Sequence, residues 1–182
     1  GEGCPSRFRH ETEKTSPGYY SVMLDDCGVL AEMTVTARCG FHRYVFPEGG
    51  EAGLLIDLAH RDKVIDSGIW VSGPGEVEGF RRSQSWAKDQ HVYFVARFSR
   101  PFRSGAIFAD GRWNDGLAEC RSGGLKQYLS FGAAGGEPLM VKVGISAVDV
   151  EGARRNLDAE MPGWDFEGYK DAARDTWNGA LG

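Results

Sequence analysis

The chain has 182 residues and a formal net charge of −5 at pH 7, with 41% hydrophobic and 26% charged residues. These proportions are typical of a globular domain and exclude an intrinsically disordered chain. No apolar run approaches the roughly 20 residues that a membrane-spanning helix needs, so we expect no membrane span. An acidic chain also lacks the excess of Lys and Arg that non-specific nucleic-acid binding requires, so we expect no nucleic-acid partner.

Most of the chain alternates apolar and polar residues with the period of two that is typical of β-strands. Glycine supplies 26 residues, about twice its usual share, which indicates many tight turns. The clearest hairpin joins residues 19–24 to residues 29–36 through the turn sequence Asp25-Asp26-Cys27-Gly28. Further strands are expected at residues 40–46, 54–58, 68–72, 77–81, 91–98, 106–109, 127–131 and 139–145. About ten short strands predict a mainly all-β fold, an antiparallel β-sandwich.

The end of the chain changes to a helical pattern. Residues 150–161 form a plausible short helix, which Pro162 and Gly163 stop. Asp165 then stands where an N-cap belongs, and an apolar face with helical spacing follows it. We therefore divide the chain into a β-sandwich domain at residues 1–148 and a helical cap or connector at residues 149–182, with one or two helices.

The sequence indicates no metal site. The cysteines (Cys4, Cys27, Cys39 and Cys120) are widely spaced, without a C-x-x-C pair, so we expect mostly free, buried thiols. The segment His10-Glu11-Thr12-Glu13 begins like a metalloprotease helix, but Lys14 stands where the second histidine belongs. We assign no catalytic residue and no cofactor to the chain.

Residues 79–90 (GFRRSQSWAKDQ) carry the most interesting polar cluster. Arg81 and Arg82 could bond sugar hydroxyls while the indole of Trp86 covers the apolar face of a pyranose ring. The alternative is structural: Trp86 anchors a loop onto the sandwich, and the arginines pair with acidic residues. Elsewhere, Trp164 and Trp177 are expected to pack the helical end. Three further arginines are expected to be solvent-side charges that protect a strand edge: Arg97, Arg100 and Arg103.

Five segments resemble a known family. Residues 8–20 (FRHETEKTSPGYY) are similar to the F-x-H-E-x-E-x-x-x-P-G-Y-Y stretch in the amino-terminal domain of glycoside hydrolase family 92, the bacterial α-mannosidases. Further blocks match in the same order, at residues 40–44, 57–62, 79–90 and 141–164. The resemblance runs from about residue 8 to residue 181, which is nearly the whole chain.

The resemblance implies a β-sandwich joined to a larger helical (α/α)₆ domain that holds the catalytic carboxylates and a calcium ion. Such enzymes remove terminal mannose from α-mannoside glycans with inversion. This chain would then be a non-catalytic amino-terminal domain, inactive alone, that forms part of the substrate cleft. We expect substrate contacts at Trp86, Arg81, Arg82, His10 and Glu13. The expected location is the periplasm, the surface or the exterior of a bacterium.

Two other functions stay open at this point. The first is a stand-alone carbohydrate-binding module that uses Trp86, Arg81 and Arg82. The second is a small complete glycosidase in which Glu11, Glu13 or Asp62 acts. The resemblance also implies that the upstream part of the sandwich and the helical domain are missing. An unpaired strand edge and an uncovered helix face would then be exposed, so we expect the chain alone to self-associate.

Overall fold

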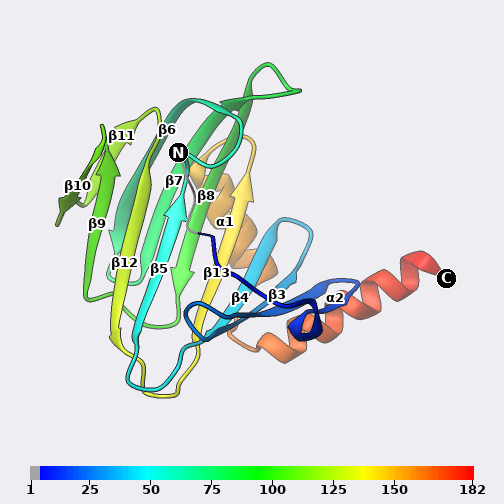
Figure 1. The fold of residues 1–182 in the computed structure, drawn as a ribbon. Helices are drawn as coiled ribbons and strands as arrows, with labels where there is room; N and C mark the ends of the chain where they lie inside the picture. Colours follow the sequence, from blue (N-terminus) through cyan, green and yellow to red (C-terminus); the bar gives the residue numbers. More distant parts are fainter. Residues whose placement is uncertain (1–4) are drawn as a thin grey trace.

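The computed structural model describes residues 5–182 (Figure 1). A 3₁₀ turn η1 (His10–Thr12) comes first, and two helices, α1 (Val150–Glu160) and α2 (Phe166–Leu181), come last. The strands between them are β1 (Lys14–Ser16), β2 (Tyr19–Leu24), β3 (Val29–Val35), β4 (Cys39–Val45), β5 (Glu51–Asp57), β6 (Lys63–Gly73), β7 (Glu76–Gln84), β8 (Gln90–Phe98), β9 (Ser104–Ala109), β10 (Arg112–Asp115), β11 (Glu119–Ser122), β12 (Lys126–Ala133) and β13 (Leu139–Ser146).

The strands form two antiparallel sheets that face each other. The large sheet has nine strands in the order β1-β2-β3-β4-β13-β8-β7-β6-β11, and the small sheet has four in the order β10-β9-β12-β5. Apolar side chains fill the space between them, with Ile69, Ile107, Leu129 and Leu139 fully buried. The predicted mainly-β sandwich with two C-terminal helices is therefore confirmed.

Three short strands escaped the sequence analysis: β1, β10 and β11. Each has only three or four residues, mostly polar and exposed, so no apolar alternation marks it. By contrast, the long apolar run at residues 91–98 is a central strand, as expected. Phe94, Val95 and Ala96 are buried in succession because the small sheet covers one face of β8 and helix α1 covers the other.

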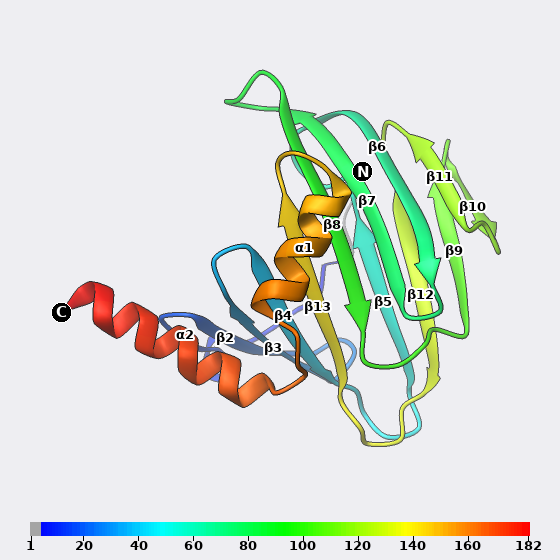
Figure 2. The ribbon, with the colours of Figure 1, turned by 180° about the vertical axis from the view of Figure 1, so that it is seen from behind.

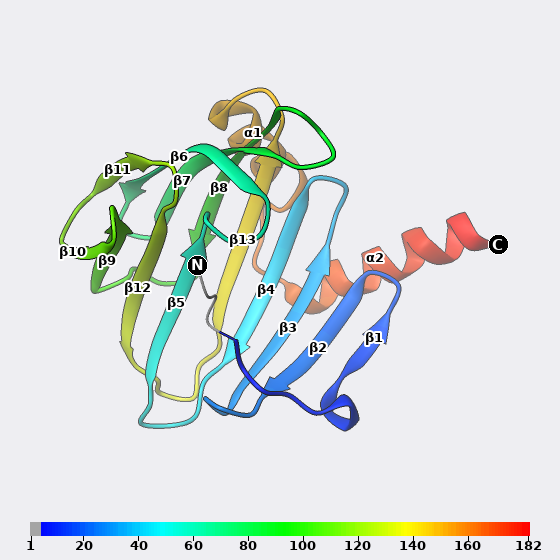
Figure 3. The same cartoon turned by 45° about the horizontal axis from the view of Figure 1, so that its top comes forward.

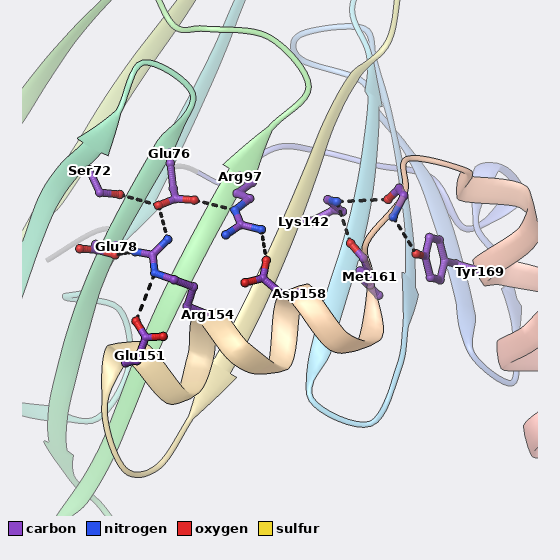
Figure 4. Close-up of polar contacts among 11 residues, drawn as sticks. Ser72, Glu76, Glu78, Arg97, Lys142, Glu151, Arg154, Asp158, Met161 and Tyr169 are labelled. Atoms are coloured by element: carbon purple, nitrogen blue, oxygen red, sulfur yellow. Dashed lines mark hydrogen bonds and ion pairs between the residues drawn. The ribbon is translucent and has the colours of Figure 1, made fainter.

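Helix α1 lies on the outer face of the large sheet and is held there by charged side chains (Figures 2 and 4). Its N-cap is Asp149, whose carboxylate accepts the Gly152 amide at 2.5 Å. Glu76 on β7 lies at the centre of the contact: Arg97 on β8 donates to it at 2.5 Å and Arg154 on α1 donates at 2.6 Å. The network thereby ties the helix to two strands.

The three arginines expected at a strand edge do not share one environment. Arg97 lies on a central strand and bonds Glu76 and Asp158, so the expectation was wrong for it. The Nε and Nη2 atoms of Arg100 are buried, so it is no solvent-side charge either. Arg103 is exposed, as expected. A residue's position along an alternating run does not reveal whether a helix covers its face.

Helix α2 packs across β2 and β3 on the same outer face (Figure 2). Phe166 is buried against Phe41, with ring centroids 5.3 Å apart, and Tyr169 contacts the same ring. Arg43 on β4 joins Glu32 to Glu167 of the helix, at 2.6 and 2.8 Å. The expectation that this helix face lies uncovered was therefore wrong for its first half.

A buried lysine fixes the turn between the two helices. Lys142 on β13 donates to the carbonyls of Met161 and Gly163 at 2.7 and 3.1 Å (Figure 4). Its ammonium also lies 4.2 Å from the ring centroid of Trp164, which confirms a packing role for that tryptophan. These contacts satisfy the carbonyl of Met161, the C-cap of α1, and that of Gly163 in the turn that follows.

The cysteines of the described residues are free thiols, as expected, but only one is buried. Cys39 lies inside, Cys120 is partly exposed and Cys27 is exposed. Burial raises the pKa of Cys39 to about 11, so its thiol stays protonated at neutral pH. Cys4 lies outside the described residues.

We predict that Glu76→Gln destabilises the protein by roughly 2–3 kcal/mol at pH 7, because Arg97 and Arg154 lose their shared carboxylate. Burial opposes ionisation of Glu76, but hydrogen bonds from Arg97, Arg154 and Ser72 outweigh it and lower its pKa from 4.5 to about 2. A lowered folded-state pKa stabilises the fold above pH 4.5, and this contribution is lost as the pH falls toward 2. Urea unfolding at pH 7 and pH 3 measures both effects.

Glu151→Gln is the matched control, because Glu151 contacts Arg154 from an exposed position on α1. We expect it to change stability by less than about 0.5 kcal/mol. If Glu76→Gln lowered stability as little as Glu151→Gln does, the charged network would not hold α1. The same would follow if the stability of Glu76→Gln fell between pH 7 and pH 3 as much as that of the wild type.

Candidate functional site

The hairpin between β7 and β8 presents a bare aromatic side chain. Trp86 at its tip is 92% exposed. A hydrogen bond from the Ser85 amide to the Ala87 carbonyl, 3.0 Å long, shapes the tip. Trp86 therefore does not anchor the loop onto the sandwich, and both faces of its indole are open to a ligand.

Arg82 and Arg81 point to opposite faces of β7, as consecutive residues of a strand must. The guanidinium of Arg82 makes a two-pronged contact with Asp89, at 2.7 and 2.8 Å. His91 lies 3.0 Å from the same carboxylate. The hydrogen bond from Arg82 lowers the pKa of Asp89, so this carboxylate stays ionised and closes the base of the hairpin.

Arg81 holds the turn between β5 and β6. It donates to the carbonyls of Leu58 and His60 at 2.9 and 3.0 Å and to the hydroxyl of Ser83 at 2.9 Å. Asp62 lies 4.0 Å away. Arg81 therefore positions the loop at residues 58–62 through bonds to two carbonyls and one hydroxyl. The acidic pairing that the structural alternative expected is made by Arg82, with Asp89.

His10 and Glu13 form a second cluster, at η1. His10 Nδ1 lies 2.5 Å from Glu13 Oε2, and the hydroxyl of Tyr20 donates to Glu13 Oε1 at 2.6 Å. The bonds from Tyr20 and His10 lower the pKa of Glu13. A general acid needs a raised pKa, so this environment does not suit Glu13 to protonate a leaving group.

The structure does not bring the five predicted contact residues together. The His10–Glu13 cluster lies against β2, whereas Trp86, Arg81 and Arg82 belong to the β7–β8 hairpin. Three strands, β3, β4 and β13, separate β2 from β8, so the clusters lie roughly 20 Å apart across the sheet. One sugar ring cannot touch both clusters.

The sequence analysis missed a paired histidine and tyrosine. His42 Nδ1 lies 2.9 Å from the hydroxyl of Tyr44, beside an apolar cavity of about 270 Å³ between the sheets. Burial lowers the pKa of His42 and raises that of Tyr44 to about 12, so both are neutral at pH 7. The available signal was the alternation of GFHRY, which places His42 and Tyr44 on one face and Phe41 and Arg43 on the other.

Among residues 5–182, no three His, Cys, Asp or Glu side chains gather to hold a metal ion. No helix in this part of the chain is both long and apolar enough to cross a bilayer. The described surface presents an exposed indole at the tip of a hairpin, beside polar groups already paired with one another.

Comparison with known proteins identifies the fold. Residues 1–146 match the family model described as the glycosyl hydrolase family 92 N-terminal domain. The chain belongs to glycosyl hydrolase family 92. The resemblance seen in the sequence is confirmed.

Solved structures of family 92 agree with this assignment. A family 92 α-mannosidase from Bacteroides thetaiotaomicron is 32% identical, with a TM-score of 0.88, over 94% of this chain and 24% of that protein. A second family 92 glycosyl hydrolase is 26% identical, with a TM-score of 0.89, over 97% of this chain and 25% of that one.

An uncharacterized secreted glycosidase of Arthroderma benhamiae is 27% identical over 202 residues, covering 94% of this chain and 25% of that relative. The chain therefore spans about a quarter of the length of these family 92 relatives.

We predict that Arg81→Met frees the loop at residues 58–62. Two backbone carbonyls lose a charged donor, so amide hydrogen exchange in this loop should accelerate at least tenfold, with a loss of roughly 2 kcal/mol in stability. Arg82→Met is the control, because its exposed pair with Asp89 contributes less than about 1 kcal/mol. Equal exchange of the loop in both variants would contradict the role of Arg81.

Proposed function

We propose that the chain is the non-catalytic, amino-terminal β-sandwich domain of an inverting exo-α-mannosidase and forms one wall of its substrate cleft. The observation that carries the proposal is the 32% identity to a family 92 α-mannosidase over 94% of this chain. The same relative has also been solved in complex with mannoimidazole. In this proposal the rest of the enzyme is a helical domain that supplies the catalytic groups, and the substrates are α-mannoside glycans.

Trp86 is the residue that we propose contacts the glycan. A flat indole stacks on the apolar C–H face of a pyranose, and the pair of Arg82 with Asp89 keeps the hairpin rigid beneath it. Arg81 then acts by positioning a neighbouring loop. His10 and Glu13 remain proposed contacts for a more distant part of the glycan, since they lie on another part of the sheet.

The family implies calcium dependence. The described residues bring together no group of three His, Cys, Asp or Glu side chains, so they do not fit a calcium site of their own. We therefore place the ion in the proposed helical domain and derive no step through it. When bound there, calcium would organise oxygen ligands and substrate hydroxyls around the scissile bond.

A stand-alone carbohydrate-binding module is the second candidate, because Trp86 is fully presented without any other domain. A small complete glycosidase is less well supported, because such an enzyme needs one carboxyl group with a raised pKa beside a second carboxylate. The pKa of Glu13 is lowered instead.

We also propose a periplasmic, cell-surface or secreted location in a bacterium; the secreted relative supports export from the cell. Finally, we propose that the chain alone self-associates through the last turns of α2. This helix carries the exposed side chains of Trp177 and Leu181, and its C-terminal end extends past the strands in Figure 1.

We predict that the purified chain, with calcium present, releases no mannose from α-mannobiose. The reason is that the catalytic groups lie in another domain. A longer polypeptide that also includes the remaining three quarters of the length of the family 92 relatives should release mannose under the same conditions. Chromatographic detection of free mannose is the measurement, and sustained release by the 182-residue chain would overturn the proposal.

We predict that Trp86→Ala in the active polypeptide raises KM about tenfold and leaves stability unchanged, because the indole contacts solvent rather than protein. Trp113→Ala is the matched control, an exposed tryptophan on β10 at the far edge of the small sheet. Kinetics on an α-mannoside measure KM, and urea unfolding measures stability. Mannoside binding by the 182-residue chain itself, lost in Trp86→Ala, would favour the binding module.

A further inference from the structure

Three connections meet at one end of the large sheet (Figure 3). They are the β7–β8 hairpin, which carries Trp86, the turn between β3 and β4, and the loop from β13 to α1. The amide of Ile145, near the end of β13, donates to the carbonyl of Arg38 in the β3–β4 turn at 3.0 Å. The side chain of Asn156 on α1 donates to the Ile145 carbonyl at 2.8 Å. Hydrogen bonds therefore fix the turn, the strand end and the helix relative to one another.

A hollow of about 720 Å³ lies among these connections, and cationic side chains line it. Its volume is within the range of about 300–1,000 Å³ that is typical of small-molecule sites. Arg38, His91 and Arg155 contribute to the lining from the β3–β4 turn, β8 and α1. In the described part of the chain, no Asp or Glu side chain lines the hollow. Its lining is therefore rich in N–H donors and lacks carboxylate acceptors.

The two arginines of this lining still have donors to offer. The one acidic partner of Arg155 among the described residues is Glu151, whose carboxylate is 4.0 Å from Nη1 and so beyond hydrogen-bond distance. Arg38 bonds Glu160 through its amide and Nε, and its two Nη atoms make no hydrogen bond within residues 5–182. Free guanidinium N–H groups bind carboxylate and sulfate oxygens well, because both partners are charged.

Aliphatic side chains form another part of the lining. Val148 directly precedes Asp149, the N-cap of α1, and a hydrophobic residue at this position often packs onto the first turns of the helix. Val148 is 77% exposed instead, and Ile145 is exposed too. Both line the hollow. An apolar surface beside unpaired guanidinium groups suits a ligand that has C–H groups on one side and an anionic group on another.

We propose that this hollow binds a pyranose that carries an anionic group, either a carboxylate or a sulfate ester. Arg155 and Arg38 hold the anion, and the sugar ring lies on Val148 and Ile145. The β7–β8 hairpin supplies His91 to this hollow and carries Trp86 at its tip, so one element serves both glycan contacts. The site goes beyond the proposed mannosidase function, which requires no anionic sugar.

A titration of the 182-residue chain followed by NMR tests the proposal. Methyl glucuronide and methyl glucoside 6-sulfate are the anionic probes, and methyl glucoside is the neutral control. We expect at least one anionic probe to shift the amides of residues 145–148 and 152–156 and to bind at least tenfold more tightly than methyl glucoside. The tighter of the two identifies the anionic group.

Three results of this titration would overturn the proposal. In the first, neither anionic probe shifts these amides. In the second, the neutral glucoside binds as tightly as the anionic probes, so that the charge has no role. In the third, inorganic sulfate binds as tightly as the better sugar probe, so that the ring has no role.

A pair of substitutions gives an independent check. Arg155→Gln should weaken binding of the better probe at least tenfold, because it removes a charged donor from the hollow. Arg174→Gln is the matched control, since Arg174 is an exposed arginine on α2 that pairs with Asp171. Urea unfolding checks that both variants fold as the wild type does. Equal affinity in the two variants would contradict the site. Because no enzymatic activity is measured, failure here is distinct from failure of the proposed mannosidase function.

Discussion

The large sheet has to bury apolar side chains on both faces, and the rest of the structure follows from this constraint. The small sheet covers one face, and helices α1 and α2 cover part of the other. Three consecutive residues of β8 are buried for this reason. The helices are thus packed layers of the fold, with Phe41 and Leu157 at the centre of their contact with the sheet. Burial of this kind supplies most of the stability of a domain.

Charged groups then decide where the helices lie on that face. An apolar contact has no directional preference, whereas the bonds that Arg154, Arg97 and Arg43 make to carboxylates between helix and sheet are directional. A partly buried ion pair adds little net stability, because desolvation offsets attraction. Here the ion pairs of Arg154 with Glu76 and Glu78 fix which turn of α1 faces β7.

The same arginine chemistry limits what the surface can bind. Guanidinium groups that already meet a carboxylate or two carbonyls, as in Arg82 and Arg81, have few donors left for a ligand. Trp86 has no such commitment. In the function that we propose, the hairpin offers a glycan an apolar plane above a polar base, and the rest of the cleft comes from groups outside residues 5–182.

The sequence by itself determined the longer strands and both helices. Period-two alternation located ten strands, and Asp149 and Asp165 cap the two helices through side-chain bonds that depend only on neighbouring residues. The ordered blocks, including the stretch at residues 8–20, determined the family. Tertiary structure alone decided that Arg97 is partly buried and bonded to Asp158 of α1, that Arg81 positions a loop, and that His10 and Trp86 lie far apart. These outcomes depend on sheet order and on which faces are covered, and neither is set by interactions between residues close together in the chain.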